Sequence, residues 1–308
     1  MKVRSPLTKS DNLELLYTLD TDLLVKKYKK AFNIDTSSYF KGTYKIQVLK
    51  CIDTGYKFYY PFNLAGDCFF YEQLQKYDWY YMPWKWEHQQ TSKMIKKGMK
   101  VLEVGCAKGD FIKKISAEFG GKCVGLELNE DAAEKAISIG LNVKTQTIQD
   151  FSEEHKEQFD LVCSFQVLEH ISDVYTFIES MLKCLKKGGR LVIGVPNNDS
   201  FLQLDDNILN QPPHHMGLWN KKSLSSLSKL FPIKIENLYF EPLQSSHLDY
   251  YKKTINDYKF LKMDRNISRF GLLGRFYNQF LKIFFQKSLK RKYPTIDNFT
   301  ILAEYSKL

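Results

Sequence analysis

Several features that mark whole classes of protein are missing from this sequence. None of the six cysteines belongs to a CxxC pair, which argues against a zinc cluster and against a disulfide framework. No apolar run is long enough to cross a bilayer, and the first residues are too polar for a signal peptide. We therefore expect a cytoplasmic protein whose cysteines are reduced and act as small apolar side chains.

Two phosphate-binding motifs are also missing, although a glycine loop is present. Residues 99–111 read MKVLEVGCAKGDF, a buried strand followed by a loop whose small residues are Gly105, Ala107 and Gly109. A dinucleotide site needs a small residue five places after the first glycine, but Asp110 stands there. Lys108 is not followed by the Gly-Lys-Ser/Thr of a Walker loop. The loop lets a ligand approach its backbone, and that ligand is not expected to be a pyrophosphate.

Positive charge is concentrated in one part of the chain. Residues 221–293 contain 16 Lys and Arg against 5 Asp and Glu, a surplus of 11, whereas the whole chain of 308 residues carries +10. The rest of the chain is nearly balanced, and an apolar fraction of 44% supports a packed core. The basic character therefore describes a C-terminal element and not the core.

Strands and helices alternate after residue 98. Besides the strand before the glycine loop, apolar strands are expected at 122–128, 143–148, 159–165 and 188–196, with helices after Asn129 and from Asp173 to Cys184. Continuous apolar strands separated by helices predict a parallel sheet covered on both faces, an α/β architecture. Residues 233–240 and 299–306 alternate more strongly and are expected to pair as an antiparallel edge.

Three parts of the chain follow from this pattern. Residues 1–98 form an N-terminal helical and aromatic-rich segment, with a helix near 22–32 and fourteen aromatic residues between Tyr56 and Trp86. Most of these rings are expected to pack the segment onto the sheet, with two or three left for a site. Residues 99–241 and 297–308 form the core. Residues 242–296 form a basic helical insertion, interpreted as a lid or dimer contact in preference to a membrane contact through 267–292.

Acidic residues after the second and third strands suggest a nucleoside ligand. Glu127 ends the second strand, 22 residues beyond Gly105, where a carboxylate accepts hydrogen bonds from a ribose diol. Asp150 and Phe151 follow the third strand and suit an adenine amino group and ring face. Nucleoside recognition without a phosphate cradle favours S-adenosylmethionine.

The ordered set of motifs resembles the class I S-adenosylmethionine-dependent methyltransferases. The segments that carry the resemblance are VLEVGCAKGDF, VGLELNEDA, IQDF, FDLVCSFQVLEHISD, LKKGGRLVIGVPN and PPHHMGLWNKKSL, about half the chain. The VLEH and PPHH segments are similar to ubiquinone-type O-methyltransferases and to bacterial methyltransferases associated with glycan genes. FYEQLQKYDWYY…KWEH in the N-terminal segment resembles the second group. The resemblance implies a Rossmann-like, doubly wound, mostly parallel seven-stranded sheet with an antiparallel last strand.

The resemblance also implies a cofactor site, with S-adenosylhomocysteine as the product. It places Glu103, Gly105, Ala107 and Gly109 around the methionine part, Glu127 with Leu128 at the ribose, Asp150 and Phe151 at the adenine, and Phe165 and Gln166 beside the cofactor. The family commonly has glycine where this chain has Ala107. Alanine is small enough for cofactor binding to be expected.

Methyl transfer to a hydroxyl needs a general base in addition to alignment, and histidine suits neutral pH. His170 follows the fourth strand, and His214 and His215 follow the fifth, at the sheet edge where open α/β folds bind ligands. We expect the base to be His214 or His215, with His170 in support. The alternative for each is a structural histidine bonded to the loop backbone.

A divalent metal is left open and is not predicted. Small-RNA 2′-O-methyltransferases and some quinone O-methyltransferases hold an ion with an E-x-x-E-H segment and a later histidine. Here the segment begins with Gln166, an amide without charge, and continues to Glu169 and His170. Without a metal, Glu169 orients a histidine or caps the next helix.

The leading hypothesis is an enzyme that O-methylates a sugar, a sugar nucleotide or a related metabolite in polysaccharide biosynthesis. An RNA methyltransferase is the first alternative, motivated by the basic region, although no RNA-binding module is recognised. The second alternative is a non-catalytic binding protein with the same fold, and only Ala107 and Gln166 support it. The expected partners are a small-molecule acceptor and a second copy of the chain in a homodimer. The acceptor is identified most directly by analysing what co-purifies in the pocket.

Overall fold

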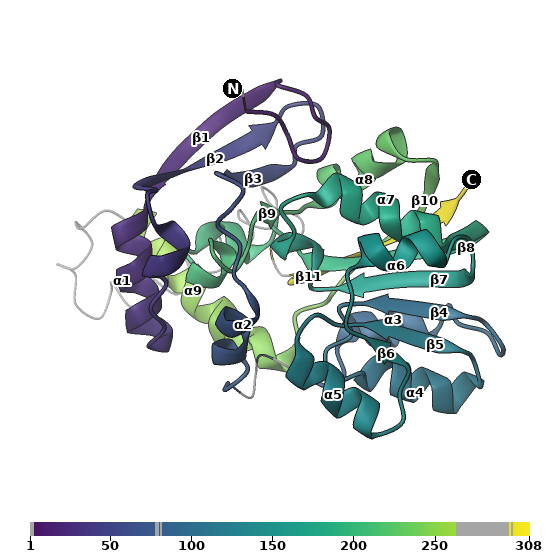
Figure 1. The fold of residues 1–308 in the computed structure, drawn as a ribbon. Helices are drawn as coiled ribbons and strands as arrows, with labels where there is room; N and C mark the ends of the chain where they lie inside the picture. The colour runs from purple at the N-terminus through teal and green to yellow at the C-terminus, as the bar shows by residue number, and fades with distance from the viewer. Residues whose placement is uncertain (1–2, 78–79, 81, 263–295, 297) are drawn as a thin grey trace, which may run out of the picture.

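The computed structural model describes residues 3–77, 80, 82–262, 296 and 298–308. These residues form two β-sheets, a larger one of seven strands and a smaller one of four. Figure 1 shows the larger sheet between two layers of helices, with the smaller sheet beside it near the N-terminus. No helix among the described residues is long and apolar enough to span a membrane.

The larger sheet has the order β10-β11-β8-β7-β4-β5-β6. Its strands are β4 (Val101–Val104), β5 (Cys123–Leu126), β6 (Val143–Lys144), β7 (Phe159–Phe165), β8 (Leu185–Pro196), β10 (Ile233–Phe240) and β11 (Thr300–Lys307). Pairing is parallel from β6 to β8, whereas β11 is antiparallel to both of its neighbours. This confirms the predicted doubly wound, Rossmann-like sheet with an antiparallel last strand.

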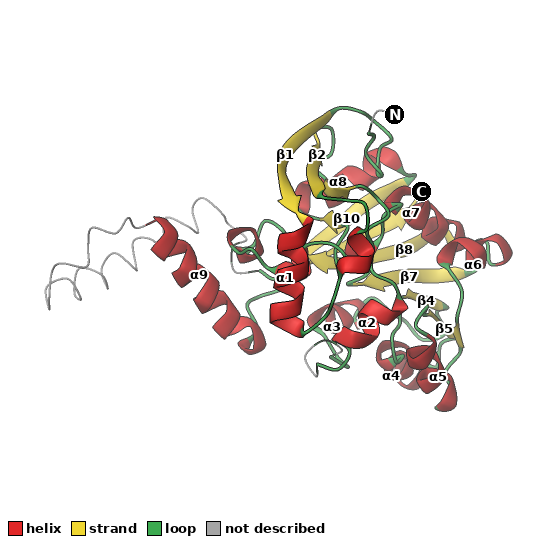
Figure 2. Ribbon diagram, turned by 60° about the vertical axis from the view of Figure 1, so that its left-hand side comes forward, coloured by secondary structure: helices red, strands yellow, loops and turns green. Residues whose placement is uncertain are grey.

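Helices cover both faces of this sheet (Figures 1 and 2). They are α4 (Asp110–Phe119) and α5 (Glu130–Ser138) on one face, and α6 (Ile148–Glu154), α7 (Val174–Cys184) and α8 (Lys221–Leu230) on the other. Neighbouring strand residues point to opposite faces. Val101 therefore packs with the α4 and α5 side chains, and Leu102 with those of α6 to α8. The predicted cap of α5 is confirmed, because the Asn129 side chain accepts from the Ala132 N–H at 2.9 Å.

The third strand was predicted too long. β6 ends at Lys144, and α6 begins at Ile148, so Asp150 and Phe151 lie in a helix. The cause is local, since the Thr147 hydroxyl accepts from the Asp150 N–H at 3.1 Å and caps that helix. The β-branched residues before it imitate a strand in the sequence.

The N-terminal segment contains a sheet that the sequence did not reveal. The sheet runs β1-β2-β3-β9, all antiparallel, with β1 (Leu13–Asp20), β2 (Lys45–Cys51), β3 (Lys57–Tyr60) and β9 (Gly217–Leu218). The predicted helix near 22–32 is confirmed as α1 (Thr21–Phe32). Two short helices follow, α2 (Cys68–Leu74) and α3 (Trp86–Ser92). Because β9 comes from the loop after β8, the segment is joined to the core.

The aromatic residues of this segment divide between packing and a site, although four of them line the cavity where two or three were expected. Tyr56, Phe58, Tyr59 and Phe70 are fully buried among other apolar side chains. Four other rings line the large cavity described below: Tyr71, Tyr80, Trp84 and Trp86.

The insertion between β10 and β11 begins with helix α9 (Leu248–Lys262), which continues from a short 3₁₀ helix at Ser245–His247. Further 3₁₀ helices lie at Ser37–Phe40, Leu168–His170, Phe201–Leu204 and Ile208–Asn210. The whole of the predicted contact segment 267–292 lies outside the described residues.

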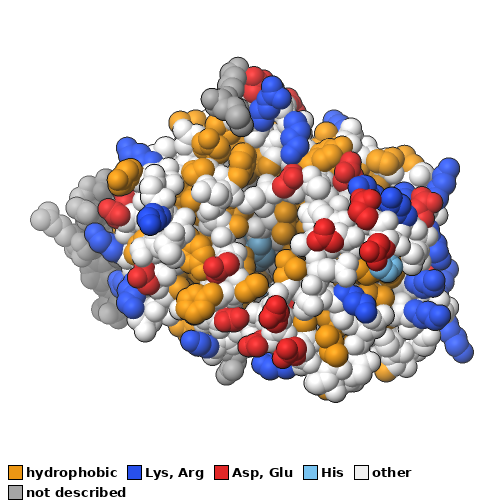
Figure 3. Space-filling view, viewed as in Figure 1, with side chains coloured by type: hydrophobic (Ala, Val, Ile, Leu, Met, Phe, Trp, Pro, Cys, Tyr) orange, Lys and Arg blue, Asp and Glu red, His pale blue; other side chains and the backbone are white. Residues whose placement is uncertain are grey.

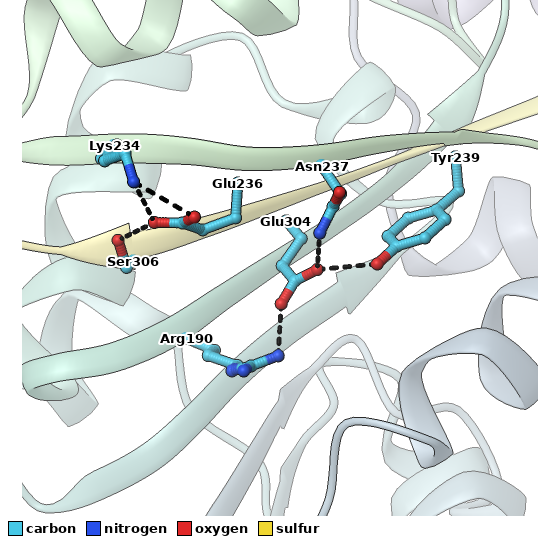
Figure 4. A network of polar contacts seen from close by, with 7 residues as sticks. All are labelled: Arg190, Lys234, Glu236, Asn237, Tyr239, Glu304 and Ser306. Carbon is cyan, nitrogen blue, oxygen red and sulfur yellow. Dashed lines mark hydrogen bonds and ion pairs between the residues drawn. The ribbon is translucent and has the colours of Figure 1, made fainter.

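A buried carboxylate ties the last strands together (Figure 4). Glu304 in β11 is 2% exposed and accepts from Asn237 Nδ2 and the Tyr239 hydroxyl, each at 2.9 Å, on β10. Arg190 on β8 pairs with its other oxygen. The network therefore links β8, β11 and β10 through one side chain.

Candidate active site

One cavity of about 1350 Å³ opens at the carboxyl ends of β4, β5 and β7. The N-terminal segment, the loop before β9, and residues from 241–250 and 299–300 form its other walls. Figure 3 shows histidine surface at the bottom of a hollow on this side of the molecule. Open α/β sheets bind ligands at this edge. Of the predicted cofactor residues, the cavity lining includes Glu103, Gly105, Ala107, Glu127, Leu128, Phe165 and Gln166.

The glycine loop has the left-handed backbone that its small residues allow. Gly105 has a φ of +81°, and a Cβ atom there would come within 2.4 Å of Val167 Cγ2. Gly109, with a φ of +77°, begins helix α4 as its N-cap. Ala107 also lies in the left-handed region, with a φ of 47°, where a side chain is unfavourable. The substitution of the family's glycine therefore keeps the loop shape at some cost in strain.

Glu127 holds this loop from the neighbouring strand. Its Oε2 atom accepts from the Ala107 N–H and its Oε1 atom from the Asn129 N–H, both at 2.8 Å. Burial raises the pKa of this carboxyl, and the backbone N–H groups lower it. Each oxygen can accept a further hydrogen bond, and Glu127 lines the cavity. This arrangement suits the two hydroxyls of a ribose, as predicted.

Glu103 at the end of β4 is only 3% exposed, and its Oε2 atom has no hydrogen-bond partner among the described residues. Burial, together with the negative charges of Glu127 and Asp110, raises its pKa well above the usual range. A buried carboxyl oxygen without a partner is unfavourable unless a ligand supplies a donor. The ammonium group of a methionine moiety is such a donor, so these residues fit S-adenosylmethionine.

The predicted contact between Phe151 and the adenine ring is wrong. Its ring is 1% exposed in the core and stacks on His155 at 3.8 Å. Asp150 accepts from the Thr147 hydroxyl at 2.6 Å and is not part of the cavity lining. The wall beside Glu127 is instead formed by Gln146, Thr147, Ile148 and Gln149. The same early start of helix α6 explains both differences.

Three histidines of the cavity lining come together in space. The ring centroids of His214 and His215 are 4.6 Å apart, and His170 lies 4.7 and 4.9 Å from them. The three candidate histidines therefore form one spatial group. Burial lowers the pKa of His170 to about 4 and lowers the pKa values of His214 and His215 well below 6.5. All three are neutral at pH 7.

Hydrogen bonds distinguish the three imidazoles. His214 is held at both nitrogens, since Nδ1 lies 2.7 Å from the Leu209 oxygen and Nε2 lies 2.8 Å from the Tyr80 hydroxyl. His215 Nδ1 lies 3.0 Å from Asn210 Oδ1. The described residues provide no partner for Nε2 of His215. A neutral histidine that donates through Nδ1 accepts a proton at Nε2, so His215 has the geometry of a base.

Glu169 lies beneath the cluster, 1% exposed, and its Oε2 atom lacks a partner among the described residues. Burial raises its pKa to about 8. One nitrogen from each of the three histidines lies within 4.8 Å of the others, close enough to hold a metal ion. The tight hydrogen bonds of His214 oppose such a role. Gln166, the amide of the predicted metal segment, turns its Nε2 atom to Glu87 at 3.3 Å.

Two cavity residues were missed because their partners are distant in the sequence. Glu87 meets Gln166 across 79 positions, and Tyr80 meets His214 across 134. Both come from the aromatic-rich stretch, whose FYEQLQKYDWYY…KWEH pattern was the only signal for them.

Comparison with known proteins agrees with this geometry. The methyltransferase domain family matches residues 80–235, just over half of the chain. The chain belongs to that family. Residues 80–235 are thus a methyltransferase domain, and the glycine loop, Glu127 and Glu103 are the residues that fit S-adenosylmethionine as its cofactor.

Two relatives illustrate the similarity within this methyltransferase core. The mitochondrial ubiquinone biosynthesis O-methyltransferase of Dictyostelium discoideum is 32% identical over 37% of this chain and 40% of its own. That of Shewanella sp. (strain ANA-3) is 30% identical over 34% of this chain and 48% of its own. The chain thus spans less than half the length of these curated relatives. A methyltransferase from Archaeoglobus fulgidus matches 71% of this chain and 94% of its own, at 18% identity and a TM-score of 0.47.

Proposed function

We propose that this methyltransferase transfers the methyl group to a hydroxyl oxygen of a sugar, a sugar nucleotide or a related small metabolite. The observation that carries the choice of oxygen is His215, a neutral imidazole whose Nε2 atom borders the cavity without a protein partner among the described residues. A hydroxyl acceptor must lose a proton as it attacks, and this nitrogen can take it. The names of the relatives also include O-methylation.

The proposed mechanism depends mainly on alignment. S-Adenosylmethionine, when bound, supplies an activated methyl group, so the protein has little covalent work to perform. Glu127 and the glycine loop fix the nucleoside, while Asn210 fixes the His215 ring through Nδ1. Burial keeps His215 neutral and ready to accept a proton, although it also makes the imidazole a weaker base. Desolvation and positioning then contribute the larger share.

Support for a polyhydroxylated acceptor comes from hydrogen-bonding side chains in the lining of the cavity. They are Asn207, Asn210, Glu241, Gln244, Ser246, His247, Tyr250 and Thr300. A site rich in such groups discriminates strongly for ligands that satisfy them. A phenolic acceptor is the second candidate, favoured by the identity with ubiquinone-type relatives.

Partners and location are further parts of this proposal. We infer a small-molecule acceptor and no nucleic acid, a homodimer or lid role for the basic insertion, and a cytoplasmic location. The six free cysteines support a reducing compartment.

The test supplies the enzyme with S-adenosylmethionine carrying a trideuterated methyl group and panels of sugar nucleotides, simple glycosides and catechols. We expect mass spectrometry to find the label on an oxygen of a sugar. Label found only on a catechol would establish the second candidate instead. Label on added RNA alone would overturn the proposal.

A further inference from the structure

Gln166 occupies an unusual position at the carboxyl end of β7. Its φ of 55° is rare for a residue with a side chain, and such strain persists only where surrounding contacts hold it. Its N–H donates to the Gly194 oxygen at 2.8 Å, which fixes it to β8. The next residue, Val167, fills the space beside Gly105. Gln166 thus lies against the glycine loop on one side and near His170 on the other.

Glu87 on helix α3 is the residue that holds the Gln166 side chain. It is 2% exposed, and its Oε1 atom accepts from Gln166 Nε2 at 3.3 Å. Burial raises its pKa, which the charge of Lys85 and the hydrogen bond from Gln166 oppose. Burying a carboxyl group is expensive, and neither core packing nor the histidine cluster requires this one. Its hydrogen bond with a cavity residue therefore calls for a functional explanation.

The orientation of the amide follows from this contact. An amide has an NH₂ that donates and an oxygen that accepts. Because the NH₂ is turned to Glu87, the Oε1 atom of Gln166 is directed away from it, and no described residue donates to it. Gln166 lines the cavity next to the loop that fits the cofactor.

We propose that Glu87 is a positioning residue, which holds the Gln166 amide so that its oxygen presents the negative end of the dipole to the sulfonium of S-adenosylmethionine. The positive charge on sulfur disappears in the product, S-adenosylhomocysteine. The amide therefore favours the substrate form of the cofactor over the product form. An amide that is fixed in this orientation before binding needs no reorganisation when the cofactor binds.

The experiment compares the affinities of the two cofactor forms by calorimetry. Glu87→Ala is expected to lower the affinity for S-adenosylmethionine about tenfold, which corresponds to the loss of one contact with a charged group. The affinity for S-adenosylhomocysteine should fall no more than about twofold. Glu87→Met, which keeps the length of the side chain but accepts no hydrogen bond, is measured in parallel with a thermal melt of each variant. Equal weakening of both ligands would show a packing role and overturn the proposal.

Two further variants test whether Glu87 acts through Gln166. Gln166→Ala should give the same selective loss, and combining it with Glu87→Ala or Glu87→Met should add nothing, because coupled residues are not additive. Glu87→Gln still offers an oxygen to Gln166 Nε2 and should restore most of the selectivity. A multiplicative loss in the double variant would refute the coupling.

A matched control lies on the same helix. Gln90 binds Lys93 Nζ at 3.0 Å and is not part of the cavity lining, so Gln90→Glu should leave both affinities unchanged. These measurements need no acceptor. A negative result would therefore leave the proposed O-methylation standing, and failure of that proposal would leave this one intact.

Discussion

The Nδ1 atom of His170 lies 2.5 Å from the backbone oxygen of His214. One hydrogen bond thus joins the segment after β7 to the loop before β9, two stretches that are 44 residues apart. The contact orients His170 and fixes the loop that carries His215. The three histidines are therefore held in a defined arrangement relative to one another.

His215 is expected to matter most for methyl transfer. His215→Ala should lower turnover about 100- to 10,000-fold, the range for removal of a general base. Cofactor affinity should remain, since Glu127 and the glycine loop lie elsewhere in the cavity. His170→Ala and His214→Ala are measured beside it, with labelled methyl transfer as the readout. Normal turnover in His215→Ala, with loss only in His170→Ala, would move the base to the segment after β7.

Removal of the Glu127 carboxylate should weaken cofactor binding for two reasons. Glu127→Ala loses the ribose acceptor and also releases the Ala107 and Asn129 N–H groups. We expect binding of S-adenosylmethionine to weaken by about 1–3 kcal/mol. Calorimetry measures the loss, and an unchanged affinity would disprove the ribose assignment.

The glycine loop permits a pair of opposite substitutions. Gly105→Ala places a methyl group 2.4 Å from Val167 Cγ2 at a left-handed φ, so it should abolish cofactor binding. Ala107→Gly removes a side chain from the same kind of conformation and should raise the melting temperature, because the relieved strain of about 1–2 kcal/mol exceeds the added chain entropy. A lower melting temperature for Ala107→Gly would contradict the strain assigned to this loop.

Acid should destabilise the fold through the histidine cluster. His170 titrates near 4 in the folded protein and near 6.5 when unfolded, so the unfolded chain binds more protons between these values. The free energy of unfolding should therefore fall as the pH drops from 6.5 toward 4, by up to about 1.4 kcal/mol per pH unit for each such histidine. His170→Asn should flatten this limb in denaturant titrations. An unaltered slope would mean that the imidazole is already protonated when folded.

The carboxylate of Glu304 offers a test of the sheet edge (Figure 4). Glu304→Ala removes the buried carboxylate that accepts hydrogen bonds from Asn237 and Tyr239 and should lower the free energy of unfolding by about 1–3 kcal/mol. Glu236→Gln, on the solvent side of β10, serves as the control and should change little. Similar effects for the two would contradict a role for burial.

The sequence predicted those features that depend on neighbouring residues. Strand and helix periodicity, the turn at Gly105 and the carboxylate at Glu127 are each encoded within a few positions, and the structure has them in place. It is harder to predict whether a side chain faces the core or the cavity when a helix begins earlier in the chain than expected. Phe151 was expected at the adenine because helix α6 was taken for the end of a strand.

Features that depend on distant contacts were not predictable in this way. The pairing of β3 with β9 joins Phe58 to Gly217, and no local pattern marks a two-residue strand. The contact between Glu87 and Gln166 is similar, because nothing near either residue in the chain identifies its partner. Such contacts are selected by packing in three dimensions.

The pairing of β3 with β9 has a consequence for how such enzymes diversify. β9 begins two residues after His215, and the Tyr59 N–H also donates to the Met216 oxygen at 3.1 Å. Tyr28 on α1 reaches the same loop, donating to the Gln211 oxygen at 2.9 Å. The N-terminal segment thus holds the histidine loop in place. A chimeric enzyme whose N-terminal segment is taken from another methyltransferase must therefore take the histidine loop from that same protein.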